Sequence, residues 1–346
     1  MQSTETMQST DTTLAKNNTR TSGARSKAPV FVLGCGRSGT TLLYHMLVSS
    51  GNFANYRTES NVINLLEPRF GNLSAPRNQR RLLDAWCNSR LGTLSGLDRT
   101  EIEPRVTAEC KNGGDFLRII MEEMARKQGV ERWADTTPEH LLNLHRIKET
   151  IPDALVIHII RDGRDVSLST DKLGYIHRLP WDRKPSVMVC GLYWEWMVNK
   201  GRRDGRDLGK DYTEVHFEDL VNHPHETLAR LGEFIEHDLN YDRIQRIGIG
   251  SVSSPNSSFQ GGSDFNPTGR WKSGYSPENL EMFEGFVGRT LEELGYELAT
   301  KDRVVLERGD LRRIRAMYHA YFDSKLFLKT KTPLGQWLVT RDLSWI

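Results

Sequence analysis

The stretch PVFVLGCGRSGTTLLYHML, residues 29–47, places a short apolar run, a glycine-rich loop and a helix-like pattern in direct succession. The apolar run Val30–Leu33 predicts a strand that is buried on both faces, and leucine and methionine recur at helical spacing after residue 41. A loop in this position points backbone N–H groups and a helix N-terminus at one place, and glycine lets a ligand approach the backbone closely. We therefore predict an anion-binding loop at residues 34–41, with an ordinary tight turn as the alternative.

The loop departs at one position from the triphosphate-binding loop of kinases and GTPases. That loop has the pattern G-x-x-x-x-G-K-[ST], in which the lysine reaches the terminal phosphates. Gly34, Gly39 and Thr41 match the pattern, but Thr40 stands where the lysine belongs, and the positive charge comes from Arg37. The loop therefore suits a terminal anion that needs neither that lysine nor a metal. A phosphosulfate fits, because a sulfuryl group carries less charge than a phosphoryl group.

A second loop with similar chemistry follows the run ALVIHII at residues 154–160. The run predicts another buried strand, and Arg161 comes directly after it. An Asp-Gly pair then turns the chain into a predicted helix that carries Ser169. An arginine and a hydroxyl at a helix N-terminus can form an anion site, although a salt-bridged turn is the alternative. Two such sites on one sheet edge indicate a ligand with two separated anionic groups, such as a nucleotide with a 5′-phosphosulfate and a 3′-phosphate.

The remaining patterns predict an α/β fold. Two further strands are expected at residues 132–138 and 212–217. The segments with helical patterns lie at residues 77–87, 115–127, 140–151, 166 onward, 186–199, 224–235 and 277–294. Strands that alternate with helices indicate one mostly parallel sheet with helices on both faces, that is, a single P-loop-type domain. Ligands of such folds bind beyond the carboxyl ends of the strands, where both loops would lie.

Composition divides the chain into a tail, a domain and an extension. Residues 1–27 are rich in polar residues and predict a disordered tail. The domain is expected at residues 28–300, and residues 301–346 form an extension with a helix and a basic, poorly patterned end. The irregular segments in the domain lie at residues 61–104, with loop at 92–104, at 173–185, at 202–210 and at 248–269. Irregular segments of this kind often face a substrate.

Bulk composition narrows the functional classes. The 47 Lys and Arg residues nearly balance the 45 Asp and Glu residues, and a net charge of +2 gives no general attraction for nucleic acid. No apolar run is long enough to span a membrane. The cysteines, Cys35, Cys87, Cys110 and Cys190, are far apart and form no metal-binding pattern. They predict a reduced, cytoplasmic setting without a metal site, with a disulfide between Cys87 and Cys110 as the alternative. The sequence leaves a homodimer open.

These motifs, taken in this order, resemble those of sulfotransferases that use 3′-phosphoadenosine 5′-phosphosulfate (PAPS). The closest resemblance is to the branch that includes the tyrosylprotein sulfotransferases and many bacterial members. RSGTTL from Arg37 matches the loop for the 5′-phosphosulfate, and RDGRDVSLS from Arg161 matches the motif for the 3′-phosphate. VHFEDL from Val215, GRWK from Gly269 and ELGY from Glu293 resemble later family segments. The resemblance covers residues 29–298.

The resemblance implies a role for each matching residue. The residues that would hold the phosphosulfate are Arg37, Ser38, Gly39, Thr40 and Thr41. Arg161 and Ser169 would hold the 3′-phosphate, and Arg270 would lie near the bound nucleotide. Phe217 lies at an aromatic position near the adenine, where a core phenylalanine is the alternative.

Transfer to a hydroxyl requires a base and positive charge at the leaving group. The resemblance implies that Glu59 is this base, with a surface glutamate as the alternative, and that Arg37 contributes charge. Other branches use a histidine, for which His140 is the nearest candidate. Relatives often have a lysine before Thr-Pro in the strand at 132–138, where this chain has Thr136. Arg37, the loop amides and another basic residue such as Arg57 are then expected to stabilise the sulfuryl group, with altered or lost activity as the alternative.

The resemblance therefore implies transfer of a sulfuryl group from PAPS to a hydroxyl or amine of an acceptor. The acceptor can be a small molecule, a carbohydrate, a lipid or a peptide, because no motif in the irregular segments identifies it. Two alternatives remain at this point. A small-molecule kinase would use ATP and Mg²⁺, and a non-catalytic protein would bind the nucleotide without turnover.

Overall fold

The computed structural model describes residues 25–249, 267–300 and 309–332. Most of the polar tail, most of the loop expected at residues 248–269, and the end of the extension therefore lie outside the described residues. Arg25–Lys27, which we expected in the tail, form a short 3-10 helix. Arg25 pairs with Asp211 at 3.0 Å, and the buried Arg132 donates to the Arg25 carbonyl oxygen at 3.0 Å. These three residues therefore pack on the fold.

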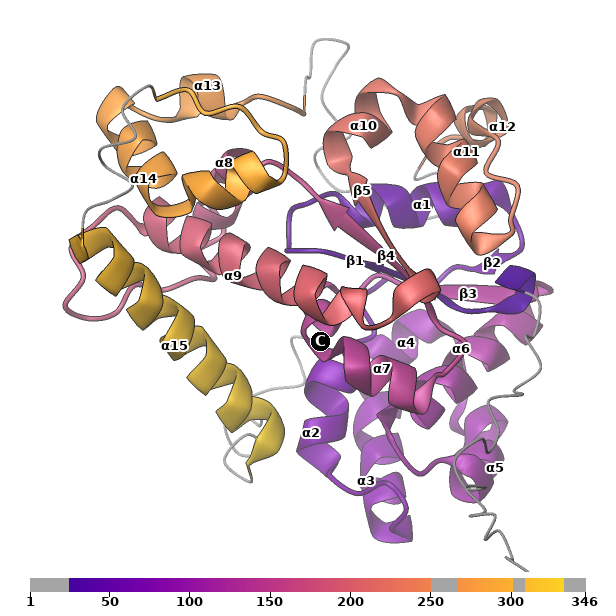
Figure 1. Cartoon of the computed structure of the whole chain (residues 1–346). Helices are drawn as coiled ribbons and strands as arrows, with labels where there is room; N and C mark the ends of the chain where they lie inside the picture. The colour runs from indigo at the N-terminus through magenta and orange to yellow at the C-terminus, as the bar shows by residue number, and fades with distance from the viewer. Residues whose placement is uncertain (1–24, 250–266, 301–308, 333–346) are drawn as a thin grey trace, which may run out of the picture.

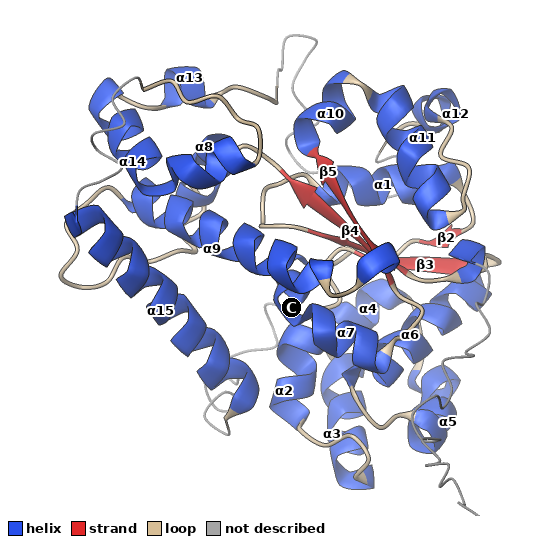
Figure 2. Ribbon diagram, viewed as in Figure 1, coloured by secondary structure: helices blue, strands red, loops and turns tan. Residues whose placement is uncertain are grey.

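A five-stranded sheet, in which every strand pairing is parallel, forms the centre of the molecule (Figure 2). The strands are β1 (Val30–Leu33), β2 (Phe53–Ala54), β3 (Arg132–Asp135), β4 (Leu155–Ile160) and β5 (Tyr212–His216), in the order β2-β3-β1-β4-β5. The prediction of a mostly parallel sheet is confirmed, and the edge strand β2 is the one that sequence patterning did not indicate. The connection that leaves β1 runs toward β2, and the connection that leaves β4 runs the opposite way to β5, so the carboxyl ends of β1 and β4 lie at a topological switch point.

Alternate residues of β1 enter two different hydrophobic cores. Val30 and Val32 pack with α1 (Thr40–Ser50), α11 (Pro224–Ile235) and α12 (Tyr241–Ile247). Phe31 and Leu33 pack with α6 (Gly113–Gln128), α7 (Leu144–Thr150) and α9 (Ser186–Arg206). Figure 1 shows α1, α11 and α12 on one side of the sheet and α6, α7 and α9 on the other. The sheet is therefore covered on both faces, which explains why its strands are nearly continuous runs of apolar residues.

The other described helices complete this arrangement. They are α2 (Glu67–Phe70), α3 (Pro76–Cys87), α4 (Arg90–Ser95), α5 (Arg99–Glu109), α8 (Gly163–Asp171), α10 (Phe217–Asn222), α13 (Trp271–Gly274), α14 (Pro277–Glu293) and α15 (Gly309–Lys331). Shorter turns are the π-helical η2 (Val62–Leu66) and the 3-10 helices η3 (Pro138–Asn143) and η4 (Gly209–Asp211). The helix expected at residues 140–151 is thus divided between η3 and α7.

Two segments that we expected to be irregular are helical. The expected loop at 92–104 contains parts of α4 and α5, because Ser89 caps α4 and an Asp98–Glu101 capping box begins α5. The expected turn at residues 202–210 is largely the end of α9. The glycine at position 205 lets α9 continue there, since a β-carbon at this position would collide with the ring of Tyr212.

The C-terminal helix α15 packs on α9 and α14, at the lower left of Figure 1. Tyr318 and Phe322 are buried in the core on its inner side. Arg315 forms an ion pair at 2.6 Å with Glu195 of α9. No helix in the described part of the chain is long and apolar enough to cross a membrane. All four cysteines are free.

Candidate functional site

The loop between β1 and α1 has little space for side chains at its glycines. A β-carbon at Gly34 would collide with the carbonyl oxygen of Ile159, and one at Gly39 would collide with the ring of Phe217. Gly39 also has a φ of 99°, which favours glycine. Arg37, a non-glycine residue, has a φ of 72°. The backbone is therefore held in a curved path that places loop amides at the N-terminus of α1.

Hydroxyl groups without partners lie beside this loop. Ser38 is fully buried, and its Oγ has no hydrogen-bond partner among the described residues. Ser167, in the first turn of α8, is also fully buried with an unpartnered Oγ. Thr40 is buried and Thr41 half-buried at the start of α1. Buried hydroxyls are normally hydrogen-bonded, so these groups have the character of ligand-binding groups.

Arg161 joins the two loops that we predicted to bind anions, called below the anion-binding loops. It follows β4, is 9% exposed, and donates from Nη1 to the Arg37 carbonyl oxygen at 2.9 Å and from Nη2 to the Pro267 carbonyl oxygen at 2.5 Å. Its guanidinium lies 4.5 Å from the centre of the Phe217 ring, and its Nε has no partner among the described residues. Phe217 is 5% exposed and also contacts the loop at Gly39, so it supports both loops.

Arg37 and Ser169 make the second link between the loops. The Arg37 Nε donates to the Ser169 Oγ at 2.9 Å, although the residues are 132 positions apart. Both side chains are half-buried. The structure thus brings together the arginine expected at the phosphosulfate and the serine expected at the 3′-phosphate.

A third arginine, Arg270, lies on the same side of the sheet. The amides of Gly269 and Trp271 donate to the Asp165 carboxylate, each at 2.8 Å, which anchors this segment to α8. Arg270 is exposed. Burial lowers the pKa of Arg161, Asp165 counters this effect, and the nearby charges of Arg270 and Arg37 lower the pKa further. Three arginines therefore converge at the carboxyl ends of β1 and β4.

The second arginine of the RDGRD motif forms an ion pair within the motif, as the alternative of a salt-bridged turn predicted, and also contacts residues that the sequence did not indicate. Arg164 is buried, pairs with Asp162 and Glu284 at 2.7 Å each, and lies 3.7 Å from the centre of the Trp271 ring. Glu218 accepts from the Asp162 amide at 3.1 Å. These contacts fix the start of α8. The close repeat of acidic and basic residues in the motif was the only sequence signal for them.

Glu59 is exposed and lies at the carboxyl end of β3, where its neighbour Ser60 donates to the Asp135 carboxylate and the Asn61 amide donates to the Thr137 Oγ1 at 3.3 Å. The Glu59 side chain reaches solvent, yet the surrounding protein and the carboxylates of Glu139 and Asp135 raise the pKa of Glu59 to about 8. Glu139 also raises the pKa of the Cys35 thiol, which belongs to the β1–α1 loop, after a larger effect of burial. Glu139 therefore lies near both Glu59 and the loop, and the structure brings Glu59 to the same end of the sheet.

His140 is held between two other groups. It is fully buried, its Nδ1 lies 2.8 Å from the Asp135 carboxylate, and its Nε2 accepts from the Ile63 amide at 3.2 Å. Burial would raise the pKa of Asp135, but His140, Ser60 and the Thr137 amide together lower it. Because both ring nitrogens are occupied, His140 serves to connect β3 to η2, and it is not placed to act as a base.

Comparison with known proteins identifies the family. A family model described as the sulfotransferase family matches residues 29–241. The chain belongs to the sulfotransferase family. No curated protein matches the chain. Among solved structures, the sulfotransferase domain from the curacin biosynthetic pathway has 17% identity and a TM-score of 0.52, covering 78% of this chain and 98% of that one. The sulfotransferase domain from the Synechococcus PCC 7002 olefin synthase has 19% identity and a TM-score of 0.51, covering 78% and 95%.

The matched region of this sulfotransferase includes both anion-binding loops and Glu59, whereas Arg270, α14 and α15 lie beyond it. The two solved structures share its fold. Within the region that the family model matches, the Thr136 Oγ1 is buried and has no hydrogen-bond partner among the described residues. Arg57 is exposed. Among the described residues, no cluster of three or more His, Cys, Asp or Glu side chains is arranged to hold a metal.

Proposed function

We propose that the protein transfers a sulfuryl group from PAPS to a hydroxyl or amine of an acceptor. The observation that carries the proposal is the pairing of two anion-binding loops at adjacent strands. Arg161 and Arg37 belong to different loops and are joined directly at 2.9 Å, while Arg37 also donates to Ser169. A ligand with an anionic group at each end is complementary to this pair of loops.

The residues present fit the two ends of PAPS. The residues proposed to hold the phosphosulfate are Arg37, Ser38, Gly39, Thr40 and Thr41. Arg161, Ser169 and Arg270 are proposed for the 3′-phosphate end, with Phe217 behind Arg161. The unpartnered Oγ atoms of Ser38 and Ser167 and the unpartnered Nε of Arg161 are the groups that a ligand would satisfy. When bound, PAPS supplies an activated sulfuryl group and a bisphosphate leaving group.

Glu59 is proposed as the general base. In its carboxylate form it takes the proton from the acceptor hydroxyl, which makes the acceptor oxygen a better nucleophile. Its pKa of about 8 suits this role, because a base is most effective when its pKa lies near the pH at which the enzyme works. The surrounding protein, followed by the carboxylates of Glu139 and Asp135, keeps the pKa of Glu59 high.

Positive charge for the leaving group is proposed to come from Arg37 and the amides at the start of α1. Thr136 offers only a hydroxyl at the position where relatives often have a lysine. We also propose a reducing, cytoplasmic setting for the reaction, which the four free cysteines support.

Calorimetric titration with adenosine 3′,5′-bisphosphate and with ATP tests the donor. We expect the bisphosphate to bind at least tenfold more tightly than ATP, and radiolabelled PAPS to transfer its label to a panel of alcohols, phenols and amines. Turnover of ATP that depends on Mg²⁺, without binding of the bisphosphate, would show a kinase instead. Binding of the bisphosphate without transfer to any acceptor would indicate a non-catalytic protein.

A further inference from the structure

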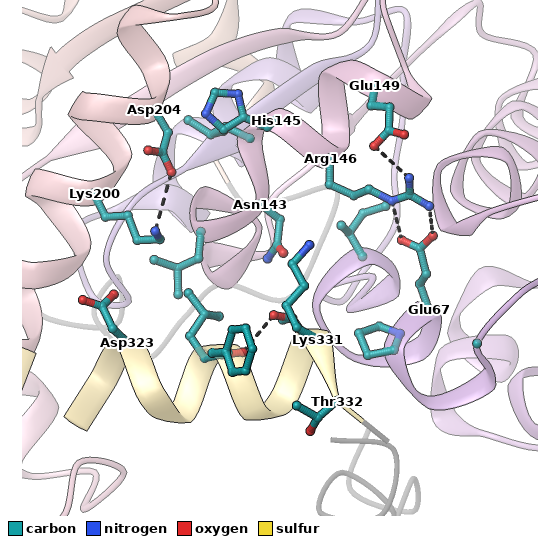
Figure 3. A pocket seen from close by; sticks show the side chains of 18 of the residues that line it. Glu67, Asn143, His145, Arg146, Glu149, Lys200, Asp204, Asp323, Lys331 and Thr332 are labelled. Carbon is teal, nitrogen blue, oxygen red and sulfur yellow. Dashed lines mark hydrogen bonds and ion pairs between the residues drawn. The ribbon is translucent and has the colours of Figure 1, made fainter. Parts of the chain in front are cut away.

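Helix α15 borders two cavities that differ in their charges. The larger, of about 880 Å³, lies between α15 and the α2 and α7 region (Figure 3). Several of its charged groups form ion pairs: Arg146 pairs with Glu67 and with Glu149, and Lys200 lies 3.9 Å from Asp204. Figure 3 shows Arg146 directed at both glutamates. This groove therefore has the character of a solvated surface with internal ion pairs.

The smaller cavity, of about 300 Å³, has an aromatic wall. It lies between α15, α9 and η3. Tyr193 and Trp196 of α9 line it together with Tyr321 and Phe322 of α15. Phe322 lies 5.4 Å from Tyr193 and 5.5 Å from Trp196, between ring centres, so the wall is one packed cluster. A wall of this kind favours a planar, largely apolar ligand.

Two lysines line the same cavity without the close pairing seen in the larger one. Lys325 and Lys329 are four residues apart on α15, so they lie on the same side of the helix. Neither forms a hydrogen bond, or an ion pair within 4 Å, with any described residue. Burial lowers the pKa of Lys329, Glu139 offsets part of this effect, and Lys325 adds to it. A partly buried ammonium without a close counter-ion gains most from an anionic ligand.

The cavity lies near the segment that carries the proposed catalytic base, Glu59, which does not itself line the cavity. Glu139 and Asn64 belong to its wall. Asn64 donates from Nδ2 to the Asn61 Oδ1 at 3.1 Å, and Asn61 donates to the Glu59 carbonyl oxygen at 3.3 Å. The charge of Glu139 acts on Glu59 and, from the other side, on Lys329. The wall that carries Glu139 is therefore continuous with the segment that carries Glu59.

We propose that this smaller cavity binds the acceptor, and that the acceptor has a planar, mainly apolar body with an anionic group that pairs with Lys329. The hydroxyl to be sulfated would then lie at the Glu59 end. This inference rests on the proposed sulfotransferase function. It assigns acceptor selection to α15, which lies outside the region that the family model matches.

A series of 4-hydroxyaryl carboxylates with spacers of increasing length tests the proposal when each is compared with its primary amide. We expect the wild-type protein, with PAPS, to prefer the best carboxylate over its amide by about ten- to a hundredfold in kcat/KM. Lys329→Met should remove this preference by raising the KM of the carboxylate, with the amide unchanged. Lys329→Glu should reverse it in favour of the corresponding 4-hydroxyaryl amine.

Lys331→Met is the matched control, because Lys331 lies on the same helix and lines the larger cavity. It should keep the preference for carboxylates. Equal use of carboxylate and amide by wild type, or a preference that survives in a folded Lys329→Met variant, would overturn the proposal. An equal loss of kcat for both acceptors would also overturn it, because Lys329 would then act on the transfer step.

Binding separates this proposal from the proposed function. Calorimetry measures carboxylate and amide binding to the protein with adenosine 3′,5′-bisphosphate present and needs no turnover. If wild type binds the carboxylates through Lys329 but transfers nothing, the acceptor assignment stands and catalysis fails. If transfer to other acceptors occurs while the carboxylates neither bind nor react preferentially, the proposed function stands and the acceptor assignment fails.

Discussion

The side proposed to bind the nucleotide and the side proposed to bind the acceptor, called below the nucleotide side and the acceptor side, are built in different ways. On the nucleotide side, backbone amides, buried hydroxyls and arginines from two strand ends are joined to each other by short contacts, as between Arg161 and the Arg37 carbonyl oxygen at 2.9 Å. On the acceptor side, long side chains from α9 and α15 surround a cavity, and Lys329 has no close partner among the described residues. If both proposals hold, the donor site is fixed by the fold, whereas acceptor selection depends on the attached helix α15.

We expect the nucleotide side to tolerate fewer substitutions than the acceptor side, because its residues pack directly on one another. Gly39 has no space for a β-carbon, because the ring of Phe217 occupies it, and Phe217 in turn lies under Arg161. A β-carbon at Gly39 would therefore displace the ring on which Arg161 lies. Lys329 lines a cavity, so replacing it alters the ligand that fits and leaves the packed core in place.

Replacement of Glu59 by Gln should produce the largest effect, because Glu59 is the proposed general base. Removal of a general base lowers turnover by about 10²- to 10⁴-fold. The nucleotide should bind as in wild type, since Glu59 contacts neither anion-binding loop through a hydrogen bond. Steady-state transfer from PAPS measures turnover, and calorimetry with adenosine 3′,5′-bisphosphate measures nucleotide binding. If the Glu59→Gln variant transfers the sulfuryl group at the wild-type rate, Glu59 is not the general base.

The pH dependence should give the next largest effect. Burial and the carboxylates of Glu139 and Asp135 raise the pKa of Glu59 to about 8, so the carboxylate that acts as base is the minority form below this pH. With an aliphatic alcohol as acceptor, kcat/KM should fall about tenfold for each pH unit below 8 and level off above it. The profile of Glu59→Gln should lack this acidic limb. An acidic limb near pH 4.5 would show that its neighbours do not act on Glu59 in solution.

The two sides also differ in how far the sequence predicts them. The strands β1 and β4 and the loops after them follow from short local patterns, glycine spacing and an arginine after a buried strand, and the structure brings these loops together. Contacts between distant residues, such as Arg164 with Glu284 or Lys329 near Glu139, have no local signal, because they depend on how helices pack. The prediction of a loop at 92–104 is wrong for a different reason. The Asp98–Glu101 capping box is a local signal for a helix start, and the prediction did not use it.

Replacement of Arg161 by Ala should act on the nucleotide side alone. The lost charge-assisted hydrogen bond should weaken binding of adenosine 3′,5′-bisphosphate by about ten- to a hundredfold. AMP, which lacks the 3′-phosphate, should bind about as it does to wild type, as measured by calorimetry. Equal losses for both nucleotides would contradict the assignment of Arg161 to the 3′-phosphate. Arg164→Ala is not a suitable control, because Arg164 is buried between Asp162 and Glu284.

Replacement of Ser169 by Ala should have the smallest effect and should show whether the two loops act as one unit. Ser169 supplies one uncharged hydroxyl, whereas Arg161 supplies a charged guanidinium, so binding of the bisphosphate should weaken only about two- to twelvefold, or about 0.5–1.5 kcal/mol. The Ser169 Oγ accepts from the Arg37 Nε at 2.9 Å. The losses in Arg37→Ala and Ser169→Ala should therefore not add in the double variant. Strict additivity would mean that the loops bind their groups independently, and the donor site would then consist of two separate anion sites.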